Sequence, residues 1–249
     1  MFDRLGPDDV VVEPFPHAVV HDALPEEVYE RLSRTRPAGP ATGANVRSVV
    51  PGWVLQRLPH VDPAWRDFVD RHLTVDMAVR VAEVFADHWV PPLPSAAALE
   101  AASWSLVGGD MIPPGLGDPV PADAEVRVDC RLETISASPE EPGSHRQQHL
   151  DLPSRLFSAL LYMRHPDDDT DGGGLVLYRW REGAPTTFAD DLELSPDRVE
   201  PVVTVPYAPN TLVVFPNSPW ALHGAEVRAA TTFERAYAFL TAEVDHNLW

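Results

Sequence analysis

The feature that most constrains this chain is a His-x-Asp pair, His149 and Asp151, which His223 follows much later in the sequence. In an extended segment, residues two apart point to the same side, so His149 and Asp151 can present an imidazole and a carboxylate together. Two imidazoles and one carboxylate on one face of a metal form the facial triad that binds iron(II). The pattern therefore predicts that His149, Asp151 and His223, the candidate triad, meet because a second strand carries His223 beside residues 149–151.

Short runs of strand character surround the candidate triad. Apolar runs over residues 156–163 and 175–178 flank a turn rich in Asp and Gly over residues 167–174, which is typical of two strands joined by a tight connection. A run over residues 210–217 ends in a Pro-Asn turn before His223, and a buried strand is expected over residues 235–243. Further strands are expected at residues 102–107 and 202–205.

Residues 126–133 alternate between apolar and charged side chains. Val126, Val128, Cys130 and Leu132 share one face of the predicted strand, and the charged residues share the other. We expect the charged face, which includes Arg131, to line the mouth of a barrel. The single cysteine is then a small core residue rather than a reactive thiol.

Helix patterns gather in the first part of the chain. A short amphipathic helix is expected over residues 24–32, with Pro25 in its first turn. A helix of some six or seven turns is expected over residues 62–89, because an Asp-Pro start precedes a long apolar face and a Pro-Pro pair follows it. His72 and His88 are expected at the polar margin of this long helix, since neither has a partner at metal-ligand spacing.

These patterns predict a mainly β fold with N-terminal helices and about eight to ten short strands in a double-stranded β-helix core, of the jelly-roll or cupin type. A chain of 249 residues is expected to form one domain. Residues 1–98 would supply supporting helices and strands, and residues 99–249 would form the core.

Composition narrows the classes of partner. The net charge is −19, from 19 basic and 38 acidic residues, which disfavours nucleic acid and anionic membrane because both would repel this surface. We expect a small-molecule substrate instead. The lone Cys130 and the lack of a signal-like or membrane-spanning run predict a reducing, cytoplasmic location. Many Ala, Arg, Asp and Pro with few Lys are typical of GC-rich coding DNA, which is associated with bacterial secondary metabolism.

Residues 149–240 resemble the catalytic core of the iron(II)- and 2-oxoglutarate-dependent oxygenase superfamily, closest to its prolyl-hydroxylase-like branch. The matching features are His149-x-Asp151, the strand ending in Tyr162, the Gly-Gly turn before a Leu-rich strand, the strand leading to His223, and Arg235. Residues 14–27 also resemble the way many of these enzymes begin.

The resemblance implies that the candidate triad holds iron(II), with 2-oxoglutarate and dioxygen as co-substrates. It implies further that Arg235 pairs with the distal carboxylate of 2-oxoglutarate and that Tyr162 hydrogen-bonds the same group. Arg228 competes with Arg235 for this role, because the interval from His223 to Arg235 is slightly longer than in prolyl hydroxylases.

The expected reaction is hydroxylation, or another oxidation, of a sugar, an amino acid or a natural-product intermediate, with release of succinate and CO2. Because Asp151 fills the carboxylate position, no site is left for chloride, and hydroxylation is favoured over halogenation. Desaturation, ring closure and epimerisation use the same ligands and stay open. Two other hypotheses are a cupin-like metal dioxygenase or isomerase that does not use 2-oxoglutarate, and a noncatalytic ligand-binding barrel.

Several polar residues are candidates for substrate contact. Arg47, Trp53 and Gln56 belong to an irregular N-terminal stretch of the kind that lends loops to an active-site mouth. Arg131 is a candidate on the charged face of its strand, and His145 and Gln147 are candidates at the rim. These six residues are the candidate substrate contacts. Residues 179–201 are expected to form a long acidic loop, either a lid or an oligomer contact.

Overall fold

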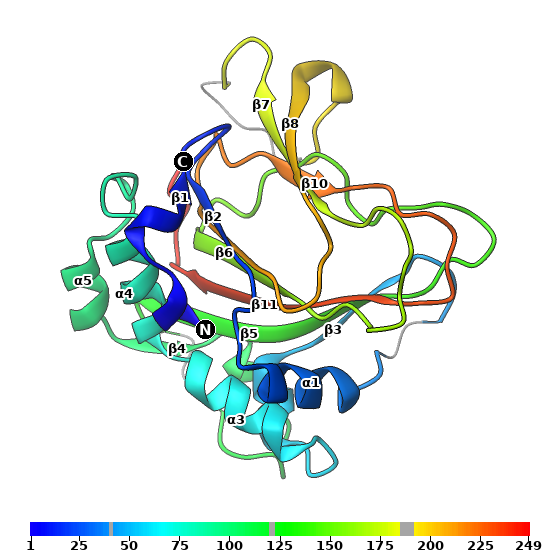
Figure 1. Cartoon of the computed structure of the whole chain (residues 1–249). Helices are drawn as coiled ribbons and strands as arrows, with labels where there is room; N and C mark the ends of the chain where they lie inside the picture. Colours follow the sequence, from blue (N-terminus) through cyan, green and yellow to red (C-terminus); the bar gives the residue numbers. More distant parts are fainter. Residues whose placement is uncertain (40–41, 120–122, 185–191) are drawn as a thin grey trace.

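The structure, a computed structural model, describes residues 1–39, 42–119, 123–184 and 192–249. Its strands form an eight-stranded sheet and a three-stranded sheet that lie on opposite sides of a shared interior (Figure 1). This architecture confirms the predicted mainly β fold with a jelly-roll core. None of the helices in the described part of the chain is long and apolar enough to cross a membrane.

The large sheet has the strand order β1-β2-β9-β6-β11-β5-β3, and β4 pairs with β5 in parallel. Its long central strands are β5, β6 and β11, and N-terminal strands lie at both edges. The bounds are β1 Val10–Val11, β2 His17–Val20, β3 Arg47–Val50, β4 Trp104–Leu106, β5 Val126–Ile135, β6 Arg155–Tyr162, β9 Leu212–Pro216 and β11 Arg235–Glu243.

The small sheet has the order β10-β7-β8, with β7 Leu175–Trp180, β8 Val199–Val205 and β10 His223–Ala225. The predicted strands on either side of the Gly-rich turn therefore belong to different sheets, because β6 lies in the large sheet and β7 in the small one. The strands extend into the region expected as a loop: β7 runs to Trp180 and β8 begins at Val199. Residues 185–191 of that expected loop lie outside the described residues.

Every residue of the central strand β6 is buried, as its near-continuous apolar run requires, and both faces of the sheet around it are covered. One face packs against the helices, and the apolar residues of β5 named above lie on it, as predicted. The other face packs against the small sheet through residues such as Leu160, Leu177 and Phe215. The helices gather on the outer side of the large sheet (Figure 1): α1 Glu26–Arg34, α2 Gly52–Arg57, α3 Pro63–His72, α4 Val75–Val84 and α5 Ala96–Ala101.

The prediction of one long helix over residues 62–89 is wrong. Asp62 does cap a helix, but α3 ends at His72 and α4 starts at Val75, with Thr74 in an extended conformation between them. Leu73 and Val75 are both buried, whereas a continuous helix would place them about 200° apart on its surface. The break lets both side chains reach the core. His72 is also buried rather than marginal, and its Nδ1 hydrogen-bonds the Phe68 carbonyl at 2.8 Å.

Candidate metal centre and its pocket

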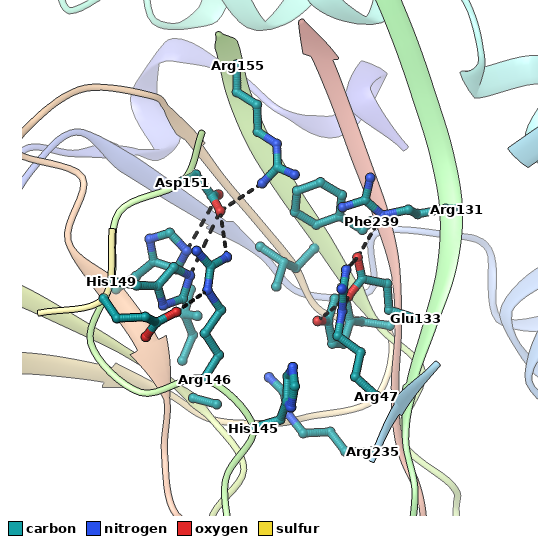
Figure 2. A pocket seen from close by; sticks show the side chains of 16 residues that line it. Arg47, Arg131, Glu133, His145, Arg146, His149, Asp151, Arg155, Arg235 and Phe239 are labelled. Carbon is teal, nitrogen blue, oxygen red and sulfur yellow. Dashed lines mark hydrogen bonds and ion pairs between the residues drawn. The ribbon is translucent and has the colours of Figure 1, made fainter. Parts of the chain in front are cut away.

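The structure brings the candidate triad together. Each of the three side chains is buried and offers a ligand atom, and these atoms all lie within 4.8 Å of one another (Figure 2). His223 begins β10 and forms an antiparallel bridge with His149, in which each backbone N–H donates to the other's carbonyl, at 2.8 and 3.2 Å. Residues 149–151 do not form the expected regular strand, since only His149 forms bridges there. The prediction that a second strand carries His223 beside them is confirmed.

Backbone carbonyls orient both imidazoles. The Nδ1 atom of His149 lies 2.6 Å from the Gln147 carbonyl, and that of His223 lies 2.9 Å from the Ala221 carbonyl. Because a carbonyl only accepts, Nδ1 carries the proton in each ring and Nε2 keeps a free lone pair. The two Nε2 atoms lie 3.9 and 3.6 Å from the Asp151 carboxylate oxygens. Burial lowers the pKa of both histidines, which keeps them neutral, the form that binds a metal.

Asp151 is held as a carboxylate by side chains that are not metal ligands. Arg155 Nη1 donates to its Oδ1 at 2.8 Å, and the Ser158 hydroxyl donates to its Oδ2. Burial alone would raise the pKa of Asp151, but the Arg155 guanidinium holds it well below its ordinary value. The site thus offers two neutral nitrogens and one anionic oxygen, the donor set that suits a divalent iron.

A pocket of about 450 Å³ opens in front of the triad. The inner face of the large sheet forms one wall, where the paired residues Arg131 and Phe239, and Glu133 and Tyr237, lie side by side on β5 and β11. The prediction that the charged face of β5 lines the barrel mouth is therefore confirmed for Arg131 and Glu133 but not for Arg127 and Asp129, which do not line the pocket. On the opposite wall Arg146 adopts a φ of 63°, a left-handed conformation that is uncommon outside glycine and is often found at functional sites.

The two candidate arginines for an organic acid differ in their surroundings. Arg228 forms an ion pair with the buried Asp168. Arg235 lines the pocket, and its Nε donates to the Gly173 carbonyl at 2.6 Å, yet no carboxylate of the described residues lies within ion-pair distance of it. Its guanidinium lies 5.5 Å from the centroid of the Tyr162 ring. The Tyr162 hydroxyl is buried and has no hydrogen-bond partner among the described residues.

The predicted substrate contacts separate into two groups. Arg47, Arg131 and His145 line the pocket, whereas Trp53, Gln56 and Gln147 do not. Gln56 hydrogen-bonds Asp70 on the surface, and Gln147 acts through its backbone carbonyl on His149.

Sequence reasoning did not single out several other residues of the pocket wall: Glu133, Arg146, Arg155, Glu193, Tyr237 and Phe239. Two of them carried a usable signal. Glu133 stands two residues from Arg131 on the same strand face, and Arg155 stands four residues beyond Asp151. Arg146 and Glu193 carried none, because they meet only in the folded chain, where Arg146 Nε lies 2.7 Å from Glu193.

No protein-family model matches this chain, and no curated protein matches it in sequence. Several solved structures are similar to it. A provisionally named oxygenase from Shewanella oneidensis has a TM-score of 0.52 at 12% identity, covering 92% of this chain and 81% of the other. A prolyl-4-hydroxylase from Pseudomonas putida has a TM-score of 0.46 at 13% identity, covering 99% and 100%. HygX from Streptomyces hygroscopicus, solved with nickel and 2-oxoglutarate bound, has a TM-score of 0.46 at 12% identity, covering 94% and 85%.

At these identities the likeness concerns the fold. The Shewanella protein shares that fold with this chain over most of both lengths. The names of other similar structures include prolyl-4-hydroxylases and 2-oxoglutarate oxygenases, the superfamily that residues 149–240 resemble. The jelly-roll fold described above is thus one that this chain shares with the Shewanella protein.

Proposed function

We propose that this protein is a non-haem iron(II)- and 2-oxoglutarate-dependent oxygenase that hydroxylates, or otherwise oxidises, a small molecule. One observation carries the proposal: a buried two-histidine, one-carboxylate donor set shares a pocket with Arg235, a buried arginine that has no carboxylate partner among the described residues. An unpaired buried cation is costly. A pocket that keeps one beside a metal site is suited to an anionic ligand that reaches both.

In this proposal His149, Asp151 and His223, which border the pocket, would hold the iron. The two backbone carbonyls fix the imidazole orientation, and Arg155 and Ser158 fix the carboxylate, so the donor set is organised before a metal arrives. Arg235 holds the distal carboxylate of 2-oxoglutarate, with the Tyr162 hydroxyl as a second donor to the same group. Burial raises the pKa of Tyr162 to about 12, so its hydroxyl keeps its proton and can donate.

When bound, iron(II) and 2-oxoglutarate supply the oxidation of a C–H bond by dioxygen, with release of succinate and CO2. The chain's own part is to position and shield this chemistry. Leu160, Leu175 and Phe239 place apolar surface in the pocket wall, which limits the water that reaches the reacting atoms.

Anaerobic titration of the metal-free protein with iron(II), and then with 2-oxoglutarate, tests the proposal. We expect the weak visible charge-transfer absorption of a chelated 2-oxo acid in the wild-type protein and its loss in Asp151→Ala. Bound iron without this absorption would support a cupin-like enzyme that does not use 2-oxoglutarate. A protein that binds no iron would instead be a noncatalytic barrel.

A further inference from the structure

A chain of ion pairs, buried except at Arg47, runs along the inner face of the large sheet, and three of its members, Arg47, Arg131 and Glu133, line the pocket. Asp129 and Arg131 pair at 2.8 Å, Arg131 and Glu133 at 2.7 Å, and Glu133 and Arg47 at 2.6 Å. We call these four residues the charged wall. Burying charges has a large desolvation cost, and buried ion pairs are often no more stabilising than apolar residues of similar volume, so stability alone is a poor reason for this chain.

Glu133 is the centre of the charged wall, and all its accepting positions are filled. Its Oε1 accepts from Arg47 Nη2 and Arg131 Nε, and its Oε2 accepts from Arg47 Nε and the Tyr237 hydroxyl. Glu133 therefore has no lone pair left for a ligand. What it does is hold Arg47 by two parallel hydrogen bonds in a single orientation.

Arg47 keeps donors that nothing in the described structure uses. Its Nε and one Nη2 proton point to Glu133, while its Nη1 has no hydrogen-bond partner among the described residues. Its side chain is 36% exposed, against 3% for Glu133, and it lines the pocket. Figure 2 shows Arg47 on the wall opposite Arg146, His149 and Asp151. The free edge of its guanidinium, made of Nη1 and the second Nη2 proton, matches the two oxygens of a planar carboxylate.

An apolar substrate would cover these paired charges without replacing their water, which is unfavourable. Arg235 is the arginine assigned to 2-oxoglutarate, so the free edge of Arg47 is left for the second substrate. Given the proposed oxygenase function, on which this inference rests, we propose that Arg47 recognises the second substrate. We propose that this substrate is a small organic acid bound through its carboxylate.

A panel of paired compounds tests this proposal in the iron-loaded protein. The panel contains the standard amino acids and a set of aliphatic and aromatic carboxylic acids, each beside its primary amide, together with glucose and glucose 6-phosphate. Succinate release above the substrate-free background is measured. We expect acids to stimulate release and their amides to be at least about tenfold weaker, since a charge-assisted hydrogen bond is lost.

Three variants then assign the preference to Arg47. Arg47→Gln should lower the stimulation by the best acid at least about tenfold through KM, and Arg47→Lys should restore part of it because the charge returns without the fork. Arg34→Gln is the matched control, since Arg34 is an exposed arginine paired with Glu30. In all three variants the charge-transfer absorption with 2-oxoglutarate should stay as in the wild type.

The outcomes separate this inference from the function on which it rests. Loss of the absorption in the wild-type protein would overturn the oxygenase function itself. If the absorption is intact, three results of the panel would overturn the recognition role of Arg47: amides that work as well as their acids, stimulation by glucose 6-phosphate or glucose alone, or no stimulation by any acid. An Arg47→Gln variant that keeps the wild-type preference for acids would also overturn it.

Discussion

Arg235 and Arg228 are both buried arginines beside the same Gly-rich turn, and their partners predict opposite effects of substitution. Arg235→Met should raise the dissociation constant of 2-oxoglutarate on the order of 100-fold, because a buried carboxylate loses its charged partner. Arg228→Met should leave that constant near the wild-type value but lower the free energy of unfolding by about 1–3 kcal/mol, since Asp168 loses Arg228 and keeps only its longer ion pair with Arg164, at 3.5 Å. Absorption titration and urea unfolding measure the two effects. The reverse pattern would exchange the two assignments.

The residues of the site differ in how far sequence could reveal them. His149, Asp151 and His223 stand out because metal-ligand chemistry demands those residue types at a spacing that a sheet can close. Arg155 and Glu133 stand near Asp151 and Arg131 in the sequence, but Arg47 joins the charged wall only because β3 pairs with β5 across a long interval of sequence, and Arg146 meets Glu193 only in the folded chain. Such contacts are properties of tertiary pairing, which local pattern does not contain.

Gly172, in the turn before β7, and Gly183, which follows β7, differ in the space around them. Gly172 and Gly183 have nearly the same φ, 81° and 85°, but a Cβ on Gly172 would lie 2.1 Å from the Val227 carbonyl oxygen, whereas a Cβ on Gly183 would meet nothing within 4 Å. Gly183→Ala should therefore cost only the left-handed conformation, about 1 kcal/mol. Gly172→Ala should cost roughly 3 kcal/mol because the neighbouring backbone must also move. Urea unfolding of the two variants measures the difference, and equal costs would show that the turn relaxes freely.

The charged wall joins β3, β5 and β11, and it should make stability depend on pH. Burial raises the pKa of Glu133, but Arg47 and Arg131 outweigh it and hold that pKa at about 2, against 4.5 ordinarily. A carboxyl group with a lowered folded pKa stabilises the fold fully above its unfolded pKa and loses that contribution as the pH falls toward the folded value. For Glu133 the contribution is on the order of 3 kcal/mol.

The difference in unfolding free energy between the wild type and Glu133→Gln should therefore be largest at neutral pH and should narrow below about pH 5. Urea unfolding at a series of pH values, followed by tryptophan fluorescence, measures it. A difference that stays constant down to pH 3 would mean that the hydrogen bonds of Glu133, rather than its charge, hold the wall together.

Among the elements, strands were predictable where one face is apolar, as in β5, and where an apolar run has strand length, as in β6 and β9. The break between α3 and α4 was not predictable, because no Gly or Pro marks it in the sequence. The chain breaks between α3 and α4 so that Leu73 and Val75 can both be buried in the core. The sheet, rather than the helix sequence, sets the position of that core.

Across the whole molecule, the fold class followed from the sequence but the strand order did not. β2 pairs with β9 and β3 pairs with β5, so N-terminal residues complete both edges of the large sheet. These long-range pairings connect the first fifty residues directly to the strands that carry the pocket. We expect ligands bound in the pocket to stabilise the entire chain rather than one half of it.

Thermal unfolding tests this coupling and the order of binding together. A ligand at about 100 times its dissociation constant adds roughly 2.7 kcal/mol to folding stability, and each kcal/mol raises Tm by about 2–4 °C for a chain of this size. Iron(II) and 2-oxoglutarate together, without oxygen, should then raise Tm by roughly 10 °C or more. 2-Oxoglutarate alone should have little effect if, as proposed, Arg235 supplies one anchor for it and the metal supplies the other. Asp151→Ala should abolish the joint shift, and a metal-independent shift with 2-oxoglutarate would show that Arg235 alone provides its affinity.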